Sequence, residues 1–227
     1  MSHFTVVVMM EEGQTIEDLL APYDENIVVE RYIEHTKQEL IDKGKKEIED
    51  YKNGVYAQYK QNPKAYNDSK NEEHIKYLRY KFPRKLKWTD EQIHKDQTRW
   101  YSKKDIGKGG EVYSTYNPKS KWDWWRVGGR WDGCMLKLPA IDDGNGGFNF
   151  DGKFETPERN SCKVSEIADD FVPFAFVTPD GVWHARAKMG WWAITRDEKD
   201  ETKWKDEFRA AKNMYNKATA TLVACHI

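Results

Sequence analysis

Helical and strand patterns are segregated along this chain, and that segregation limits the folds open to it. Strand patterns occupy residues 3–10, parts of 110–190 and 219–225, and helical periodicity occupies about 30–100 and 198–217. Elements that are segregated in this way are typical of α+β proteins, whereas alternating elements favour parallel sheets. We therefore predict an α+β fold with a mostly antiparallel sheet, formed by the N-terminal strand, the 110–190 strands and the C-terminal strand.

The long helical stretch is predicted to be an insertion within one domain. Its apolar residues recur at helical spacing over 30–60, at Ile33, Leu40, Ile41, Ile48, Tyr51, Val55 and Tyr59. A second helix is expected over 63–80, and a third begins after Thr89, a side chain that suits a helix N-cap. Residues 1–227 are accordingly predicted to form a single domain, with 30–105 as a helical insertion.

The amino-acid composition changes near residue 105, after which Gly, Trp and Asp become frequent. Ten of the 15 glycines lie within 105–160, which indicates turns and close backbone approaches. Two short strands are expected around a turn at Gly128-Gly129, with Trp122 and Trp124 on one strand face. Thr-Pro-Asp-Gly at 178–181 predicts the turn of a hairpin between the flanking strands.

Charge and cysteine usage limit the class of partner and compartment. With 37 basic and 38 acidic side chains the net charge is −1, so the sequence gives no strong nucleic-acid signal. Residues 61–130 carry a net charge of +8, which suits either a phosphate-bearing ligand or a solvated helical face. Three cysteines without a CxxC pair favour a reducing, cytoplasmic compartment. The sequence has no run of about 18 apolar residues, the length that a membrane-spanning helix needs. The first residues resemble a strand more than a signal peptide.

The densest candidate site lies between Tyr116 and Trp131. Indole rings offer faces for stacking, arginines suit phosphate, and glycines let backbone amides approach a ligand. The candidate ligand-binding residues there are Tyr116, Asn117, Lys119, Trp122, Trp124, Trp125, Arg126, Gly128, Gly129, Arg130 and Trp131. Core packing of the tryptophans and a simple hairpin turn explain the same pattern equally well.

A second candidate segment carries Trp183 to Trp192. On a strand, His184, Arg186 and Lys188 share one face, which suits either a phosphate or plain solvent. His184, Arg186, Trp191 and Trp192 complete the predicted ligand-binding set. The candidate acid–base residues are His184, His3, His226 and Asp123.

Metal and cofactor signals are weak. His3, Cys225 and His226 come together if the first and last strands pair, but they lack the ligand spacing of zinc sites, so no metal is predicted. Common catalytic and phosphate-loop motifs are missing from the sequence, and no cofactor is predicted.

Several of these segments together resemble a family of functionally uncharacterised proteins of tailed bacteriophages and some bacteria. The resemblance rests on the MSHFTV start, the segment from Pro22 to Asn26, YNPKSKWDWWRVGGRW at 116–131, WHARAKMGWW at 183–192 and the CHI ending. Trp125 stands where the family has Tyr, and Ala224 where it has Asp. The resemblance implies a phage-related protein of the host cytoplasm without an established reaction. By analogy with other small phage proteins, we expect an accessory protein that counteracts host defence.

Three functions remain open at this point. The first is sequestration of a nucleotide-derived ligand, such as a host immune signalling nucleotide, between tryptophan faces and arginines. The second is a hydrolase or phosphodiesterase that acts on such a nucleotide. The third is an inhibitor that binds a protein partner through its aromatic surface. A homo-oligomer is possible in each case.

Overall fold

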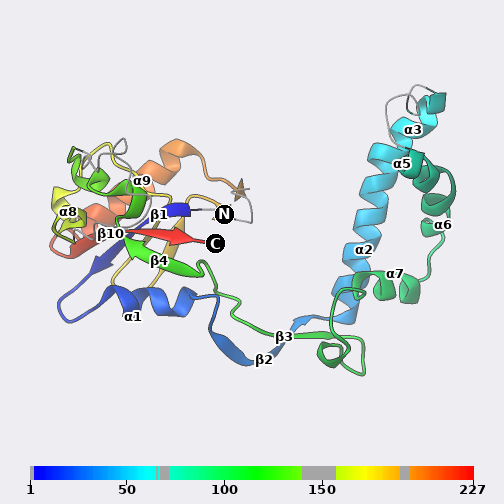
Figure 1. Cartoon of the computed structure of the whole chain (residues 1–227), viewed down its shortest axis with the longest axis horizontal. Helices are drawn as coiled ribbons and strands as arrows, with labels where there is room; N and C mark the ends of the chain where they lie inside the picture. Colours follow the sequence, from blue (N-terminus) through cyan, green and yellow to red (C-terminus); the bar gives the residue numbers. More distant parts are fainter. Residues whose placement is uncertain (1–2, 65, 67–71, 140–156, 190–194) are drawn as a thin grey trace. The chain divides into compact units, whose positions relative to one another are not determined.

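The computed structural model describes residues 3–64, 66, 72–139, 157–189 and 195–227. The chain forms two compact units: unit 1 comprises Met1–Val28 and Tyr116–Ile227, and unit 2 comprises Val29–Thr115. Both helices and a mostly antiparallel sheet are present, so the predicted α+β class is confirmed (Figure 1).

Unit 1 is built on a mixed sheet of six strands. Its strands are β1 (His3–Met10), β4 (Trp124–Val127), β5 (Ser161–Lys163), β6 (Ala175–Val177), β7 (Trp183–Ala185) and β10 (Thr219–His226). The strand order is β4-β10-β1-β6-β7, and β5 also pairs with β10. Only the β1–β6 pair is parallel among the described pairs.

The two faces of this sheet bury different clusters because successive strand residues point to opposite sides. Val7 and Leu222 pack with Trp204 and Phe208 of α9 (Glu201–Met214) on one face. Val6 and Val223 pack with Leu20 of α1 (Ile16–Leu20) on the other. Each face is therefore covered by a helix, and strand parity tells which face any side chain of β1 or β10 occupies.

The Gly-rich segment departs from the sequence prediction. Only Trp124–Val127 forms a strand, and a 3-10 turn at Gly129–Trp131 replaces the expected second strand, so the hairpin at Gly128-Gly129 was wrong. The reason is the backbone of both glycines, with φ of 65° and 56°, which turns the chain across the sheet. The hairpin of β6 and β7 is confirmed, with antiparallel pairing on either side of the 178–181 turn.

Short segments complete unit 1. A 3-10 turn at Ala21–Tyr23 follows α1, others lie at Cys134–Leu136 and Val164–Glu166, and α8 spans Pro157–Asn160. The strands β8 (Lys188–Met189) and β9 (Thr195–Arg196) form a small separate pair.

Unit 2 begins with a strand where a helix was predicted. Strand β2 (Val28–His35) pairs with β3 (Val112–Tyr116), and the helix α2 (Lys37–Tyr51) starts only after Thr36. Thr36 and Glu39 form a capping box, which fixes that start. The β-branched and aromatic side chains of 28–33 outweigh the helical spacing that included Ile33.

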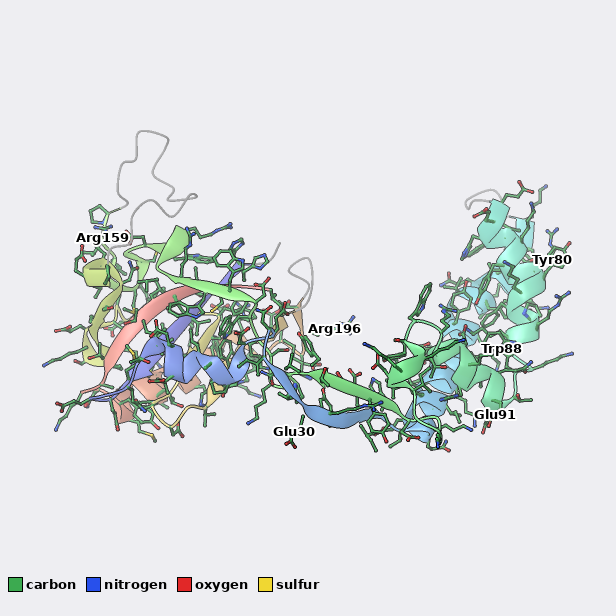
Figure 2. The ribbon with its side chains drawn as sticks, turned by 60° about the horizontal axis from the view of Figure 1, so that its bottom comes forward. Glu30, Tyr80, Trp88, Glu91, Arg159 and Arg196 are labelled. Carbon is green, nitrogen blue, oxygen red and sulfur yellow. The ribbon has the colours of Figure 1, made fainter. Side chains whose placement is uncertain are left out.

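The remaining helices of unit 2 pack around aromatic rings. They are α3 (Ala57–Gln61), α5 (Glu72–Lys76), α6 (Phe82–Lys85) and α7 (Asp90–Gln97), with π-helical turns at Lys52–Tyr56 and Tyr77–Lys81 and a 3-10 turn at Lys103–Asp105. The Phe82 ring lies 4.6 Å from that of Tyr51 and 4.9 Å from that of Tyr56. Thr89 caps α7 as predicted. The Tyr80 side chain, labelled in Figure 2 together with Trp88, is 57% exposed.

Among the described helices, none combines the length and apolar character needed to cross a membrane.

Candidate functional site

Three rings from three neighbouring strands meet at one end of the unit 1 sheet. Register pairs His3 of β1 with His226 of β10, and His226 with Trp124 of β4. The ring centroids are 4.9 Å apart for His3 and His226, 5.2 Å for His226 and Trp124, and 5.3 Å for His3 and Trp124. We call these three residues the ring cluster. Because side chains alternate along a strand, the ring cluster lies on the same sheet face as Val7 and Leu222, and α9 covers another part of that face.

The central histidine of the cluster is oriented by a carboxylate. Nδ1 of His226 lies 2.6 Å from Oδ1 of Asp123. The side chain of His226 is 9% exposed, and its Nε2 is buried without a hydrogen-bond partner in the described structure. With Nδ1–H donated to the carboxylate, a neutral His226 presents Nε2 as a proton acceptor. A buried ring nitrogen without a partner is costly in a folded protein unless something else satisfies it.

Asp123 is held by the backbone just before β4. Its N–H donates to the carbonyl of His226 at 3.0 Å, and Nδ2 of Asn26 donates to the Asp123 carbonyl at 2.9 Å. Asn26 in turn bonds Asp24 through both its side chain and its backbone. The loop at 24–26 therefore fixes where the carboxylate stands.

Positive charge borders the ring cluster. The Arg126 guanidinium lies 5.5 Å from the centre of the Trp124 ring, and no ion pair to Arg126 is found in the described part of the chain. Burial, followed by the charge of Arg130 and then by His226, the N-terminus and Arg126, lowers the pKa of His3 below its ordinary value. His3 is thus held toward its neutral form by burial and by the positive charges around it.

This arrangement has the components of a site for a small phosphate ligand. Trp124 is 38% exposed and offers a ring for stacking, while Arg126 and Arg130 supply donors for an anion. A neutral His226 held by a carboxylate is also the arrangement that general base catalysis uses. Three of the four predicted acid–base residues, His3, His226 and Asp123, are brought together here.

The other tryptophans of the segment serve packing. Trp122 is 7% exposed, and its Nε1 donates to the Leu20 carbonyl at 3.2 Å. Trp125 packs against the α1-side cluster and Trp131 against the α9-side cluster. Trp122 and Trp124 do not share a face, because the strand begins only at Trp124. The prediction of a common face was wrong for that reason.

Asn117 and the two glycines shape the backbone around the site. Asn117 is buried, and its Nδ2 donates to the carbonyls of Pro22 and Asp24 at 2.9 Å each. A Cβ on Gly129 would stand 2.8 Å from that of Ala224, so glycine lets the 3-10 turn lie close over β10. A Cβ on Gly128 would meet the Asn160 amide at 2.6 Å.

Tyr116 and Lys119 lie at the surface before β4. Tyr116 is 48% exposed, and its hydroxyl donates to Glu25 at 3.1 Å and accepts from Ser120 at 2.9 Å. The Lys119 side chain is exposed, and its backbone N–H donates to Asn117. Trp191 and Trp192 lie outside the described residues.

His184 belongs to a different part of the sheet. Its ring stacks on Phe176 at 4.5 Å, and Nδ1 lies 3.0 Å from Glu207 of α9. The strand register aligns His184 with Phe176 of β6 and Val7 of β1. Val7 is four residues from His3 along β1, so His184 lies about 13 Å from His3 along the strand direction. Arg186 pairs with Glu198, so both basic groups already have carboxylate partners.

No group of three or more His, Cys, Asp or Glu side chains suited to a metal occurs within the described ranges. Cys225 faces the α1 side of the sheet, opposite to His3 and His226, and burial raises its thiol pKa.

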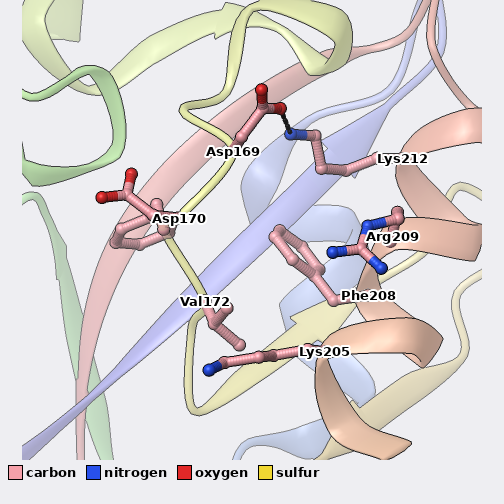
Figure 3. A pocket seen from close by; sticks show the side chains of 8 residues that line it. Asp169, Asp170, Val172, Lys205, Phe208, Arg209 and Lys212 are labelled. Atoms are coloured by element: carbon pink, nitrogen blue, oxygen red, sulfur yellow. Dashed lines mark ion pairs between the residues drawn. The ribbon is translucent and has the colours of Figure 1, made fainter. Parts of the chain in front are cut away.

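A hollow beside α9, lined by charged and apolar side chains, is a weaker candidate. Its volume is about 520 Å³, and Lys205, Arg209 and Lys212 project along it together with Phe208 (Figure 3). Each cation already has a partner: Lys205 pairs with Glu201, Arg209 with Asp206 and Lys212 with Asp169. The hollow therefore lacks the uncompensated charge found at Arg126.

Two residues that shape the site, Asn26 and Ala224, were noted in the sequence as parts of the family resemblance, but neither was included in the predicted site. Asn26 lies in a turn-forming loop and positions Asp123. Ala224 lies opposite Arg126 in the β10–β4 register, two residues before His226 of the ring cluster. Its methyl side chain places no carboxylate beside the Arg126 guanidinium. No protein-family model, curated protein or solved structure matches this chain.

Proposed function

We propose that the ring cluster and its arginines bind a nucleotide-derived phosphate ligand and sequester it. The observation that carries the proposal is the buried, unpartnered Nε2 of His226 beside the exposed Trp124 ring. A ligand that places a hydroxyl or another hydrogen-bond donor at Nε2 removes the cost of that orphaned nitrogen.

The electrostatics favour a phosphate over a neutral ligand. Arg126 makes no ion pair within the described ranges, and its charge and that of Arg130 reach His3. A phosphate would neutralise the Arg126 guanidinium, and a base would stack on Trp124. The family resemblance supports a phage-type role, in which the bound ligand is a host immune signalling nucleotide and its removal counteracts host defence in the cytoplasm.

Thermal melting with a panel of cyclic and linear dinucleotides and ADP-ribose derivatives tests binding. We expect a ligand-dependent rise in Tm that Trp124→Leu and Arg126→Gln each reduce, because stacking and one ion pair are lost. Arg209→Gln is the matched control, since it removes an exposed guanidinium already paired with Asp206. Wild-type protein that no member of the panel stabilises would overturn the proposal and favour a protein partner.

A second function, phosphodiester hydrolysis, is favoured by the Asp123–His226 pair. His226 Nε2 would take a proton from water as the water oxygen attacks phosphorus, and the leaving oxygen would depart from phosphorus with a proton from solvent. After incubation, heat denaturation releases the ligand for analysis. Intact ligand supports sequestration, whereas cleaved ligand that is lost in His226→Asn supports hydrolysis.

A further inference from the structure

A second hollow lies on the opposite, α1-side face of the same sheet end. Its volume is about 390 Å³. Phe4, Phe174 and Trp183 form its aromatic part, and the Phe4 ring lies 5.3 Å from Phe174 and 6.4 Å from Trp183. Lys121 and Lys188 also line it. We call this site the lysine hollow.

Tyr23 ties the two walls of the lysine hollow together. Its carbonyl accepts the Lys121 N–H at 2.7 Å, and its hydroxyl donates to the Gly181 carbonyl at 2.6 Å. The same hydroxyl accepts the Trp183 N–H at 3.0 Å. Because one residue holds both the lysine segment and the tryptophan strand, the shape of the hollow is set before any ligand arrives.

The two lysines of the lysine hollow differ in how their charge is balanced. Lys188 is exposed and pairs with Asp197 at 2.7 Å. Lys121 is half-buried, and no carboxylate pairs with its amine in the described part of the chain. Burial first, and the charge of Lys188 second, lower the pKa of Lys121. An amine in apolar surroundings without a counter-ion favours an anionic ligand, which would restore charge balance.

We propose that the lysine hollow binds a small carboxylic acid with an apolar body. The carboxylate would pair with the Lys121 amine, and the body would lie against Phe4, Phe174 and Trp183. The volume falls within the range of small-molecule sites, and a mostly apolar lining with a few polar groups, here Ser120, Lys121 and Lys188, is typical of them. This ligand is distinct from the phosphate ligand proposed for the ring cluster, which lies on the other sheet face.

Calorimetric titration with octanoate, octan-1-ol and octyl phosphate tests the head group. We expect octanoate to bind at least about tenfold more tightly than octanol, because only octanoate pairs with the amine. Equal affinity for octanoate and octanol would overturn the proposal. Tighter binding of octyl phosphate would overturn the carboxylate assignment and identify a phosphate head group instead.

Variants locate the binding to this hollow. Lys121→Met keeps the length of the side chain but removes the charge, and we expect it to weaken octanoate by about tenfold while octanol is unchanged. Lys119→Met is the matched control, because that neighbouring lysine is exposed and does not line the hollow. Octanoate binding that survives Lys121→Met would contradict the proposal.

A filling variant keeps the test decisive if Lys121→Met does not fold. Ala185 lines the hollow from β7, and Ala185→Leu would occupy its apolar part while leaving Lys121 intact. We expect it to melt cooperatively and to lose octanoate and octanol alike. Retained binding of both would place the ligand elsewhere.

Discussion

The carboxylate of Asp123 lies 2.6 Å from Nδ1 of His226, although the two residues are 103 positions apart. The contact joins the residue just before β4 to the last residue of β10. It orients a ring whose other nitrogen is buried and has no hydrogen-bond partner among the described residues. The candidate site is thus organised by two of the predicted acid–base residues, which strand pairing brings together from distant parts of the chain.

Asp123→Asn tests the contribution of that pair to stability. We expect the free energy of unfolding to fall by about 1–2 kcal/mol, because a charge-assisted hydrogen bond to a buried ring is replaced by a neutral one. Urea denaturation monitored by circular dichroism measures it. Asp206→Asn should change little, since that carboxylate is in an exposed pair with Arg209. Equal losses in both variants would show that the Asp123–His226 contact has no special weight.

Trp124 and Trp122 should respond in opposite ways to truncation. Trp122→Leu should cost about 2–4 kcal/mol of unfolding free energy, because that ring is 7% exposed and fills the α1-side core. Trp124→Leu should cost less than about 1 kcal/mol yet weaken a bound nucleotide by about tenfold, since its ring is 38% exposed. Thermal melting with and without ligand separates the effects. A Trp124→Leu protein as destabilised as Trp122→Leu would make Trp124 a packing residue.

Phosphate-ligand affinity should depend on pH through His3. Burial and the charge of Arg130 lower its pKa below the ordinary 6.5, so the free site carries a neutral imidazole near neutral pH. A bound phosphate favours the imidazolium, and affinity should therefore rise as the pH falls below 6.5. Calorimetry across this range measures the slope, and His3→Gln should flatten it. An unchanged slope in His3→Gln would assign the dependence to another group.

The lowered pKa of His3 has the opposite effect on the stability of the ligand-free protein. Between the lowered pKa and 6.5 the unfolded chain binds more protons at His3 than the folded chain does. The contribution of His3 to stability therefore decreases as the pH falls through that window. Urea midpoints of wild type and His3→Gln should converge above the window and separate within it, with wild type losing more.

Gly44 and Gly54 form a matched pair in unit 2. A Cβ on Gly44 would lie 2.4 Å from Cγ2 of Ile93, because α2 and α7 pack closely there, whereas nothing lies within 4 Å of one on Gly54. Gly44→Ala should destabilise unit 2 by about 1–3 kcal/mol despite the better helix propensity of alanine. Gly54→Ala should stabilise it by about 0.5–1 kcal/mol. Hydrogen exchange within Val29–Thr115 measures both, and a stabilising Gly44→Ala would refute the close packing.

Local patterns predicted most of the fold, and long-range pairing decided the rest. Periodicity and turn chemistry were sufficient for β1, α9, β10, the β6–β7 hairpin and the Thr89 cap. They failed at β2, where β-branched residues and pairing with β3 outweighed helical spacing. They also failed after Gly128, where the turn across β10 depends on Ala224, a residue far along the chain.

The site shows the same division. Residue types pointed to the tryptophans and arginines of 116–131, but one sequence cannot tell which ring is buried. The structure places Trp122 in the core and Trp124 at the surface because the strand begins between them. His3 and His226 were expected to meet only if the first and last strands paired, and the register of β1 and β10 confirms that they do.

The strand pairing also sets an order of events during synthesis. Val7 of β1 pairs with Leu222 of β10 and with Phe176 of β6, so neither neighbour of the central strand exists until the ribosome has made most of the chain. Unit 2 is continuous over Val29–Thr115 and has its sequence complete much earlier. Unit 2 can therefore fold while the valine-rich strand β1 is still unpaired and exposed. From the synthesis of β1 until that of β6 the nascent chain therefore carries an unpaired strand, which makes β1 an aggregation hazard and a natural place for a chaperone to bind.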